Sequence, residues 1–142
     1  MSGVRDMAKI LIADDDPDMR LAIASVLASR SYQIVEAGDG HEALRKLEEE
    51  KPDLLLLDLL MPGMDGFAVV KELRHTEEKR YPDVPILIIT SIREEAGQRR
   101  YELELGRKLG VDAYIEKPIE PFVLLRRVQE ILSKGGKGVE TD

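Results

Sequence analysis

The sequence predicts a three-layer α/β domain in which five parallel strands alternate with five helices. The first observation is a set of short apolar runs at residues 10–13, 53–57, 86–89 and 113–116, which are typical of buried parallel strands. The second is that helical patterns separate these runs. The third is that each run is followed by a charged or hydroxyl residue, and ligands of open parallel sheets bind beyond the carboxyl ends of the strands.

Composition excludes several classes of protein. The 142 residues suit one domain with its own core, and the absence of cysteine excludes disulfides and thiolate metal sites. A net charge of −7, from 21 Lys and Arg against 28 Asp and Glu, argues against direct binding of nucleic acid. No apolar stretch approaches the roughly 20 residues of a membrane span, and the N-terminus does not resemble a signal peptide. We therefore expect a cytoplasmic protein without membrane insertion.

The first strand and the first helix are separated by a strong boundary signal. Asp16 followed by Pro17 favours a helix start, because the Asp side chain caps free N–H groups and Pro fits the first helical position. Apolar residues at helical spacing continue to about Ser29. The sequence therefore predicts a strand at residues 8–13 and a helix at residues 17–29.

The next elements repeat this alternation. Residues 32–36 predict a short strand, and a glycine-rich turn then leads into an amphipathic helix that ends near Glu50. Pro52 separates that helix from the third strand at residues 53–57. The remaining elements are predicted as a helix at residues 67–74, a strand at 86–89, a helix at 94–109, a strand at 113–116 and a helix from Pro121 onward.

These elements can be ordered in space. Right-handed crossovers leave few topologies, and the flavodoxin-like order 2-1-3-4-5 places the first and third strands side by side. We expect a flexible N-terminus at residues 1–7, the folded domain at 8–133, and a flexible tail or linker stub at 134–142.

The residues that follow the strands can hold a divalent cation and a phosphoryl group. Asp14 and Asp15 should face Asp58, and carboxylates about 4–6 Å apart repel by about 4 kcal/mol per pair at an effective dielectric near 20. Such a cluster binds a proton or a cation, and all-oxygen ligands favour Mg²⁺. Asp58 stands alone at a strand end, which suits a nucleophile that forms an aspartyl phosphate. Thr90 and Lys117 offer a hydroxyl and a point charge to phosphoryl oxygens.

Taken together, these motifs resemble the receiver domain of bacterial two-component response regulators, in a single-domain, chemotaxis-regulator-like form. The resemblance covers about residues 9–133 and is carried by Asp14-Asp15, residues 58–66 (DLLMPGMDG), Thr90-Ser91 and Lys117-Pro118. It implies a phosphoacceptor signalling protein, not an enzyme, although one that assists its own phosphorylation and dephosphorylation. The donor would be a phosphohistidine on a sensor histidine kinase or a histidine phosphotransfer protein.

The resemblance also implies roles around the acceptor. Asp58 would accept the phosphoryl group, and Asp15, Asp58 and the backbone carbonyl of Leu60 would ligate Mg²⁺. Asp14 would act on the ion through a bound water.

Further residues would transmit the modification. Thr90 and Lys117 would hold phosphoryl oxygens, Tyr114 would swing inward when Thr90 moves, and the Lys117-Pro118 peptide would be cis. The output surface would be the fourth helix, the fifth strand and the fifth helix, for an unknown output protein or a second copy of the chain.

Two features depart from the family pattern. Leu60 and Ile92, two residues after the acceptor and after Thr90, are bulky and apolar where polar residues often flank the hydrolytic water. We therefore expect a long-lived phosphorylated state. The stretch between Thr90 and Lys117 is also longer than in the family, and the extra residues are expected to extend the fourth helix.

Two other functions fit part of the pattern. Haloacid-dehalogenase-type phosphatases carry two acids after a first strand, then a hydroxyl residue and a lysine, which are matched loosely by Asp14, Asp16, Thr90 and Lys117. Such an enzyme would use Asp14 as its nucleophile and would leave Asp58 without a role. A degenerate receiver that acts only as an interaction module is the other alternative, and the complete set of motif residues argues against it.

Overall fold

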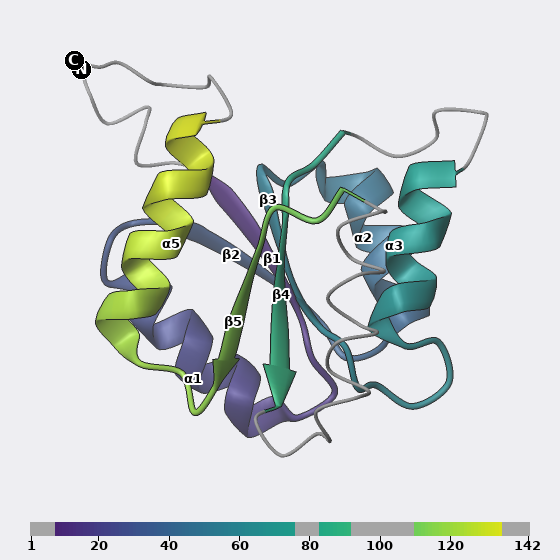
Figure 1. Cartoon of the computed structure of the whole chain (residues 1–142), viewed down its shortest axis with the longest axis horizontal. Coiled ribbons are helices and arrows are strands. Elements are labelled where there is room, and N and C mark those ends of the chain that lie inside the picture. Colours follow the sequence, from purple (N-terminus) through teal and green to yellow (C-terminus); the bar gives the residue numbers. More distant parts are fainter. Residues whose placement is uncertain (1–7, 76–82, 92–109, 135–142) are drawn as a thin grey trace.

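The computed structural model describes residues 8–75, 83–91 and 110–134, which contain five strands and four helices (Figure 1). The strands are β1 (Lys9–Ala13), β2 (Gln33–Ala37), β3 (Leu54–Asp58), β4 (Ile86–Ser91) and β5 (Ala113–Lys117). The helices are α1 (Pro17–Ala28), α2 (Gly40–Glu50), α3 (Gly66–His75) and α5 (Pro121–Lys134). The predicted helix at residues 94–109 lies outside the described residues.

The strands form one parallel sheet in the order β2-β1-β3-β4-β5, which confirms the predicted flavodoxin-like topology. Figure 1 shows α1 and α5 on one face of the sheet and α2 and α3 on the other, so the domain has three layers. Among the described helices none has the length and apolarity needed to cross a membrane.

The strongly apolar strands are buried on both faces of the sheet. All four leucines of the run 54–57 are 0% exposed. Since side chains alternate along a strand, Leu55 and Leu57 pack in the cluster under α2 and α3, whereas Leu54 and Leu56 pack in the cluster under α1 and α5. A continuous apolar run is therefore what a central strand covered on both sides requires.

Local capping explains where α1 and α2 begin. Asp16 accepts a hydrogen bond from the Asp18 N–H (2.9 Å) with Pro17 at the first position, as predicted. Asp39 caps α2 by accepting from the Glu42 N–H (2.9 Å), and Glu42 in turn accepts from the Gly38 N–H (2.8 Å). Glu42 thus satisfies the N–H of the residue just before the N-cap, and this hydrogen bond from Gly38 holds the pKa of Glu42 below its usual value.

Four strands end one or two residues later than predicted, at Ala37, Asp58, Ser91 and Lys117, and two of these ends concern the site directly. The sequence places Asp58 and Lys117 just beyond their strands, whereas each is the last residue of its strand. The ladder continues because backbone pairing does not depend on side-chain polarity: Asp58 aligns with Ile89, and Lys117 aligns with Ser91. Both side chains are consequently held by regular sheet structure and not by a loop.

Candidate functional site

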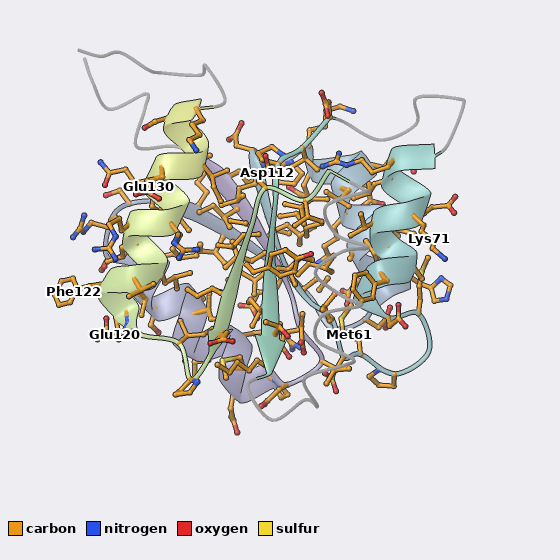
Figure 2. All side chains as sticks on the ribbon, in the orientation of Figure 1. Met61, Lys71, Asp112, Glu120, Phe122 and Glu130 are labelled. Atoms are coloured by element: carbon orange, nitrogen blue, oxygen red, sulfur yellow. The ribbon has the colours of Figure 1, made fainter. Side chains whose placement is uncertain are left out.

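The predicted site residues meet at the carboxyl edge of the sheet. Asp14 and Asp15 follow β1, Asp58 ends β3, Thr90 lies near the end of β4 and Lys117 ends β5. Because β1, β3, β4 and β5 are consecutive parallel strands, their carboxyl ends lie along one edge. Figure 2 shows Met61, in the loop after β3, near this end of the molecule and Asp112 at the opposite end of the sheet.

The three acidic residues form a cluster that fits a divalent cation. One carboxylate oxygen from each of Asp14, Asp15 and Asp58 lies within 4.8 Å of the others. Asp14 is 0% exposed and Asp58 is 4% exposed, whereas Asp15 is open to solvent. A cation could therefore enter at Asp15 and be held between two buried carboxylates. The oxygen-only donor set is that of a hard ion such as Mg²⁺.

Asp14 has one carboxylate oxygen that is satisfied and one that is not. Its Oδ1 accepts from the Asp16 N–H (2.9 Å), while its Oδ2 is buried without a hydrogen-bond partner in the described part of the chain. The nearest cation is Lys117, whose Nζ lies 3.8 Å from that Oδ2. Since buried carboxylate oxygens are normally paired, the free oxygen suits a bound cation or its water.

Asp58 has an unusual protonation equilibrium. Its Oδ1 accepts from the Leu60 N–H (3.3 Å), and its Oδ2 lies 3.6 Å from the Lys117 Nζ. Burial, and next the negative charge of Asp14, raise the pKa of Asp58 from 3.8 to about 6, although Lys117 and the Leu60 N–H oppose the shift. At neutral pH the group is still mainly a carboxylate.

Thr90 and Lys117 bring a hydroxyl and an ammonium group to the edge of the sheet that carries the acidic cluster. The Thr90 side chain is almost fully buried, and its Oγ1 has no hydrogen-bond partner among the residues described. Lys117 spans Asp14 and Asp58 by way of its Nζ. Its peptide bond to Pro118 is cis, as the resemblance implies. A hydroxyl and an ammonium group thus lie at the same edge of the sheet as Asp58.

The other predicted residues are placed less directly. Tyr114 is partly buried and packs against the cluster under α2 and α3, and its inward swing stays a prediction. Leu60 is 52% exposed beside Asp58, and the ligand role of its carbonyl also stays a prediction. Ile92 lies outside the described residues. Asp16, which the phosphatase alternative needs, is exposed and caps α1 instead of joining the cluster.

Two residues that help to build the site were given no role of their own in the sequence analysis, although Gly66 is part of the motif at residues 58–66. A Cβ atom on Gly66 would lie 2.7 Å from the Asp58 carbonyl oxygen and 2.8 Å from the Leu59 Cα, so only glycine lets α3 start this close to β3. Arg20 donates from Nη1 to the Asp14 carbonyl (2.6 Å). The sequence contained one indication of this role. A positive charge near the N-terminus of a helix is unfavourable for the helix dipole, so an arginine at this position is expected to have a partner elsewhere.

The raised pKa of Asp58 predicts a pH dependence of stability in metal-free protein. The folded protein holds this proton more tightly than the unfolded chain, whose carboxyl has a pKa near 3.8. Stability from this group is therefore greatest below about pH 4 and falls as pH rises to about 6 and just beyond, by roughly 2–3 kcal/mol. We expect Asp58→Asn to lack this loss, measured by urea unfolding with chelator present. Parallel pH curves for the two proteins would contradict the assignment.

A parallel α/β sheet with acids, a threonine and a lysine at its carboxyl edge is the arrangement expected of a phosphoacceptor signalling domain, and comparison with known proteins supports this class. The profile of the response regulator receiver domain matches residues 10–129. The chain therefore belongs to the response regulator receiver domain family, as the sequence motifs indicate.

Individual relatives support the assignment. The chain is 38% identical over 126 residues to the alkaline phosphatase synthesis transcriptional regulatory protein PhoP of Bacillus subtilis, covering 89% of this chain and 49% of that protein. It is similar to the receiver domain structure of a response regulator from Bermanella marisrubri (32% identity, TM-score 0.76, 89% and 98% coverage). It is also similar to a CheY-like receiver domain protein from Methanospirillum hungatei (26% identity, TM-score 0.80, 94% and 99% coverage). The chain spans about half the length of the curated relatives it matches.

Proposed function

We propose that this domain is a phospho-accepting switch in which Asp58 receives a phosphoryl group from a phosphohistidine. The proposal is carried by one observation: the nearly buried carboxylate of Asp58 lies in the acidic cluster with Asp14, and the Lys117 Nζ lies within 4 Å of both carboxylates. In the transfer an Asp58 oxygen bonds to phosphorus while the phosphorus–nitrogen bond breaks, and the electron pair returns to the imidazole of the donor. The donor would be a sensor histidine kinase or a histidine phosphotransfer protein.

The acidic cluster would hold Mg²⁺ through Asp15, Asp58 and the Leu60 carbonyl, with Asp14 acting through water. The ion would supply neutralisation of charge on the transferring phosphoryl oxygens. The clustered oxygens and the buried, unpaired Asp14 Oδ2 support this assignment.

Phosphorylation would then be sensed by Thr90 and Lys117. A phosphoryl group adds negative charge and acceptor oxygens, for which the buried Thr90 hydroxyl and the Lys117 ammonium are ready donors. Moving a two-state equilibrium from 1:99 to 99:1 takes about 5.5 kcal/mol, and charge-assisted bonds contribute about 1.5–3 kcal/mol each. Two or three such bonds are therefore enough to shift the equilibrium. Tyr114 would move inward when Thr90 moves toward the phosphoryl group.

The changed surface would be that of the expected fourth helix together with β5 and α5. Phe122 supports a binding role for α5, because its large apolar side chain is 72% exposed and points away from the domain (Figure 2). An output protein or a second copy of the chain would bind there.

We place the receiver at residues 8–133 and the protein in the cytoplasm, without direct contact of this domain with nucleic acid.

One experiment separates the proposed switch from its alternatives. The protein is incubated with acetyl phosphate and Mg²⁺, and intact mass and phosphate release are followed. We expect one acid-stable, base-labile phosphoryl adduct that does not form when the metal is chelated. Continuous turnover through Asp14 would instead identify a phosphatase. Neither adduct nor turnover would identify an interaction module.

The lifetime of the adduct should depend on Leu60. Its exposed apolar side chain lies two residues from Asp58, where it would exclude the hydrolytic water, together with Ile92. We expect Leu60→Asn to speed the decay of the adduct, and Leu60→Asn with Ile92→Glu to speed it further. Decay is followed by mass after the phosphodonor is removed. Unchanged or slower decay would show that the two residues do not set the lifetime.

A further inference from the structure

Arg20 is the fourth residue of α1. Its side chain links the loop after β1, which contains Asp14 and Asp15, to the neighbouring strand β2. Its Nη1 donates to the backbone carbonyl of Asp14 (2.6 Å), and its Nε donates to the Glu36 Oε1 (3.0 Å). The Arg20 side chain is only 20% exposed, while Glu36 is 44% exposed. The planar guanidinium is suited to this task, because its donors are fixed relative to one another.

The positive charges of Arg20 and Lys117 have different partners. Lys117 approaches the carboxylates of the cluster directly. Within the described ranges, the side-chain hydrogen bonds of Arg20 go to a carbonyl and to Glu36, so its charge is paired outside the cluster. A cation held this way does not occupy the oxygens that a metal ion would need.

The carbonyl that Arg20 holds belongs to the peptide unit joining Asp14 to Asp15. The same loop is fixed by the Asp14 N–H, which donates to the Ala37 carbonyl (3.1 Å), and by the Asp16 N–H, which donates to the Asp14 Oδ1. Asp14 is also held by complete burial, but the Asp15 side chain is exposed and has no such support. The direction in which Asp15 leaves the backbone therefore depends on the peptide that Arg20 holds.

We propose that Arg20 and Glu36 form a positioning pair that orients Asp15 for the divalent cation and so sets the affinity of the site. The inference rests on the proposed function, since the cation site is part of it. Hydrogen-bond partners of metal ligands commonly change metal affinity by about 10–100-fold when removed. A comparable loss is expected when either member of this pair is truncated.

Magnesium titration calorimetry at neutral pH tests the pair. We expect Arg20→Ala and Glu36→Ala each to weaken Mg²⁺ binding about tenfold or more. Arg20→Lys can keep one of the two hydrogen bonds, and Glu36→Gln keeps an acceptor for the Arg20 Nε while losing the negative charge. Both variants should therefore lie between the truncations and wild type. Arg45→Ala is the matched control, since Arg45 pairs with Glu49 on the exposed surface of α2 and should leave binding unchanged. Circular dichroism at the titration temperature verifies folding.

The direction of the changes distinguishes positioning from charge alone. If only charge mattered, removing the Arg20 cation would tighten Mg²⁺ binding and removing the Glu36 anion would weaken it. Positioning predicts that both truncations weaken it. At saturating Mg²⁺ the rate of adduct formation should return close to the wild-type rate, because Arg20 does not contact the reacting group.

Specific results would overturn the inference. They are opposite shifts in the two truncations, changes below about twofold in both, or an equal loss in Arg45→Ala. Should Arg20→Ala fail to fold, Arg20→Lys and the two Glu36 variants still decide the question. Wild-type protein that binds no Mg²⁺ and forms no adduct would instead contradict the proposed function itself.

Discussion

Replacing Asp58 with asparagine should abolish the phosphoryl adduct formed with acetyl phosphate and Mg²⁺. A carboxamide oxygen is a poor nucleophile, and the Asp58 carboxylate is the member of the acidic cluster that lies 3.6 Å from the Lys117 Nζ. We expect adduct formation to fall below detection by intact mass spectrometry, a loss of at least about 100-fold. The side chain is nearly isosteric, so the fold should be retained and metal-free stability at pH 7 should rise.

Two further variants make this result specific. Asp112→Asn is the matched control: Asp112 lies at the opposite end of the sheet and accepts from the Ile86 N–H (2.8 Å), a bond that an asparagine can also accept (Figure 2). It should form the adduct normally. Asp14→Asn should form the adduct only at higher Mg²⁺, because Asp58 is unchanged. An adduct in Asp58→Asn that is lost in Asp14→Asn would favour the phosphatase alternative.

Leu56→Ala should produce the largest loss of stability among the variants discussed here. Leu56 is 0% exposed, and its strand neighbours are Ile12 on one side and Leu87 on the other. Truncating a buried leucine costs about 2–5 kcal/mol, from lost apolar burial and the cavity left behind. Against a total of about 5–15 kcal/mol, this removes a large share of the free energy of unfolding.

Urea unfolding followed by circular dichroism measures this loss. Leu21→Ala is the control, because Leu21 is 64% exposed on α1 and its truncation should change stability by no more than about 0.5 kcal/mol. A loss below about 1 kcal/mol in Leu56→Ala would show that the centre of the sheet repacks around the cavity. Because the acidic cluster is assembled only in the folded protein, Leu56→Ala should also lower adduct formation under conditions in which part of the protein is unfolded.

Much of the fold was predictable because several local signals agreed. The uninterrupted leucines of 54–57 indicated a strand covered on both faces, and Asp16-Pro17 indicated where α1 begins. Parallel strands of this kind bring their carboxyl ends to one edge, so the meeting of Asp14, Asp58 and Lys117 could be inferred without coordinates. The strand ends were misplaced by one residue at Asp58 and Lys117, because polarity marks where a side chain is needed and not where backbone pairing stops.

The parts that were not predictable depend on contacts between distant segments. Gly66 matters because its α-carbon passes close to the backbone of β3, and the motif shows a glycine without showing what it approaches. Arg20 and Glu36 lie in different elements, and nothing in their spacing marks them as a pair. Such contacts arise only when strand order and register are realised.

By itself, the sequence determined which chemical groups this protein can bring to a phosphoryl group: two acids after β1, Asp58, a threonine and a lysine. The tertiary structure decided how those groups behave. It buries Asp14 and Asp58 beside each other, which raises the pKa of Asp58 to about 6, and it leaves one Asp14 oxygen and the Thr90 hydroxyl without hydrogen-bond partners in the described residues. The reason is physical: residue identity sets charge and hydrogen-bonding capacity, whereas burial and distance between residues far apart in the chain set their energies.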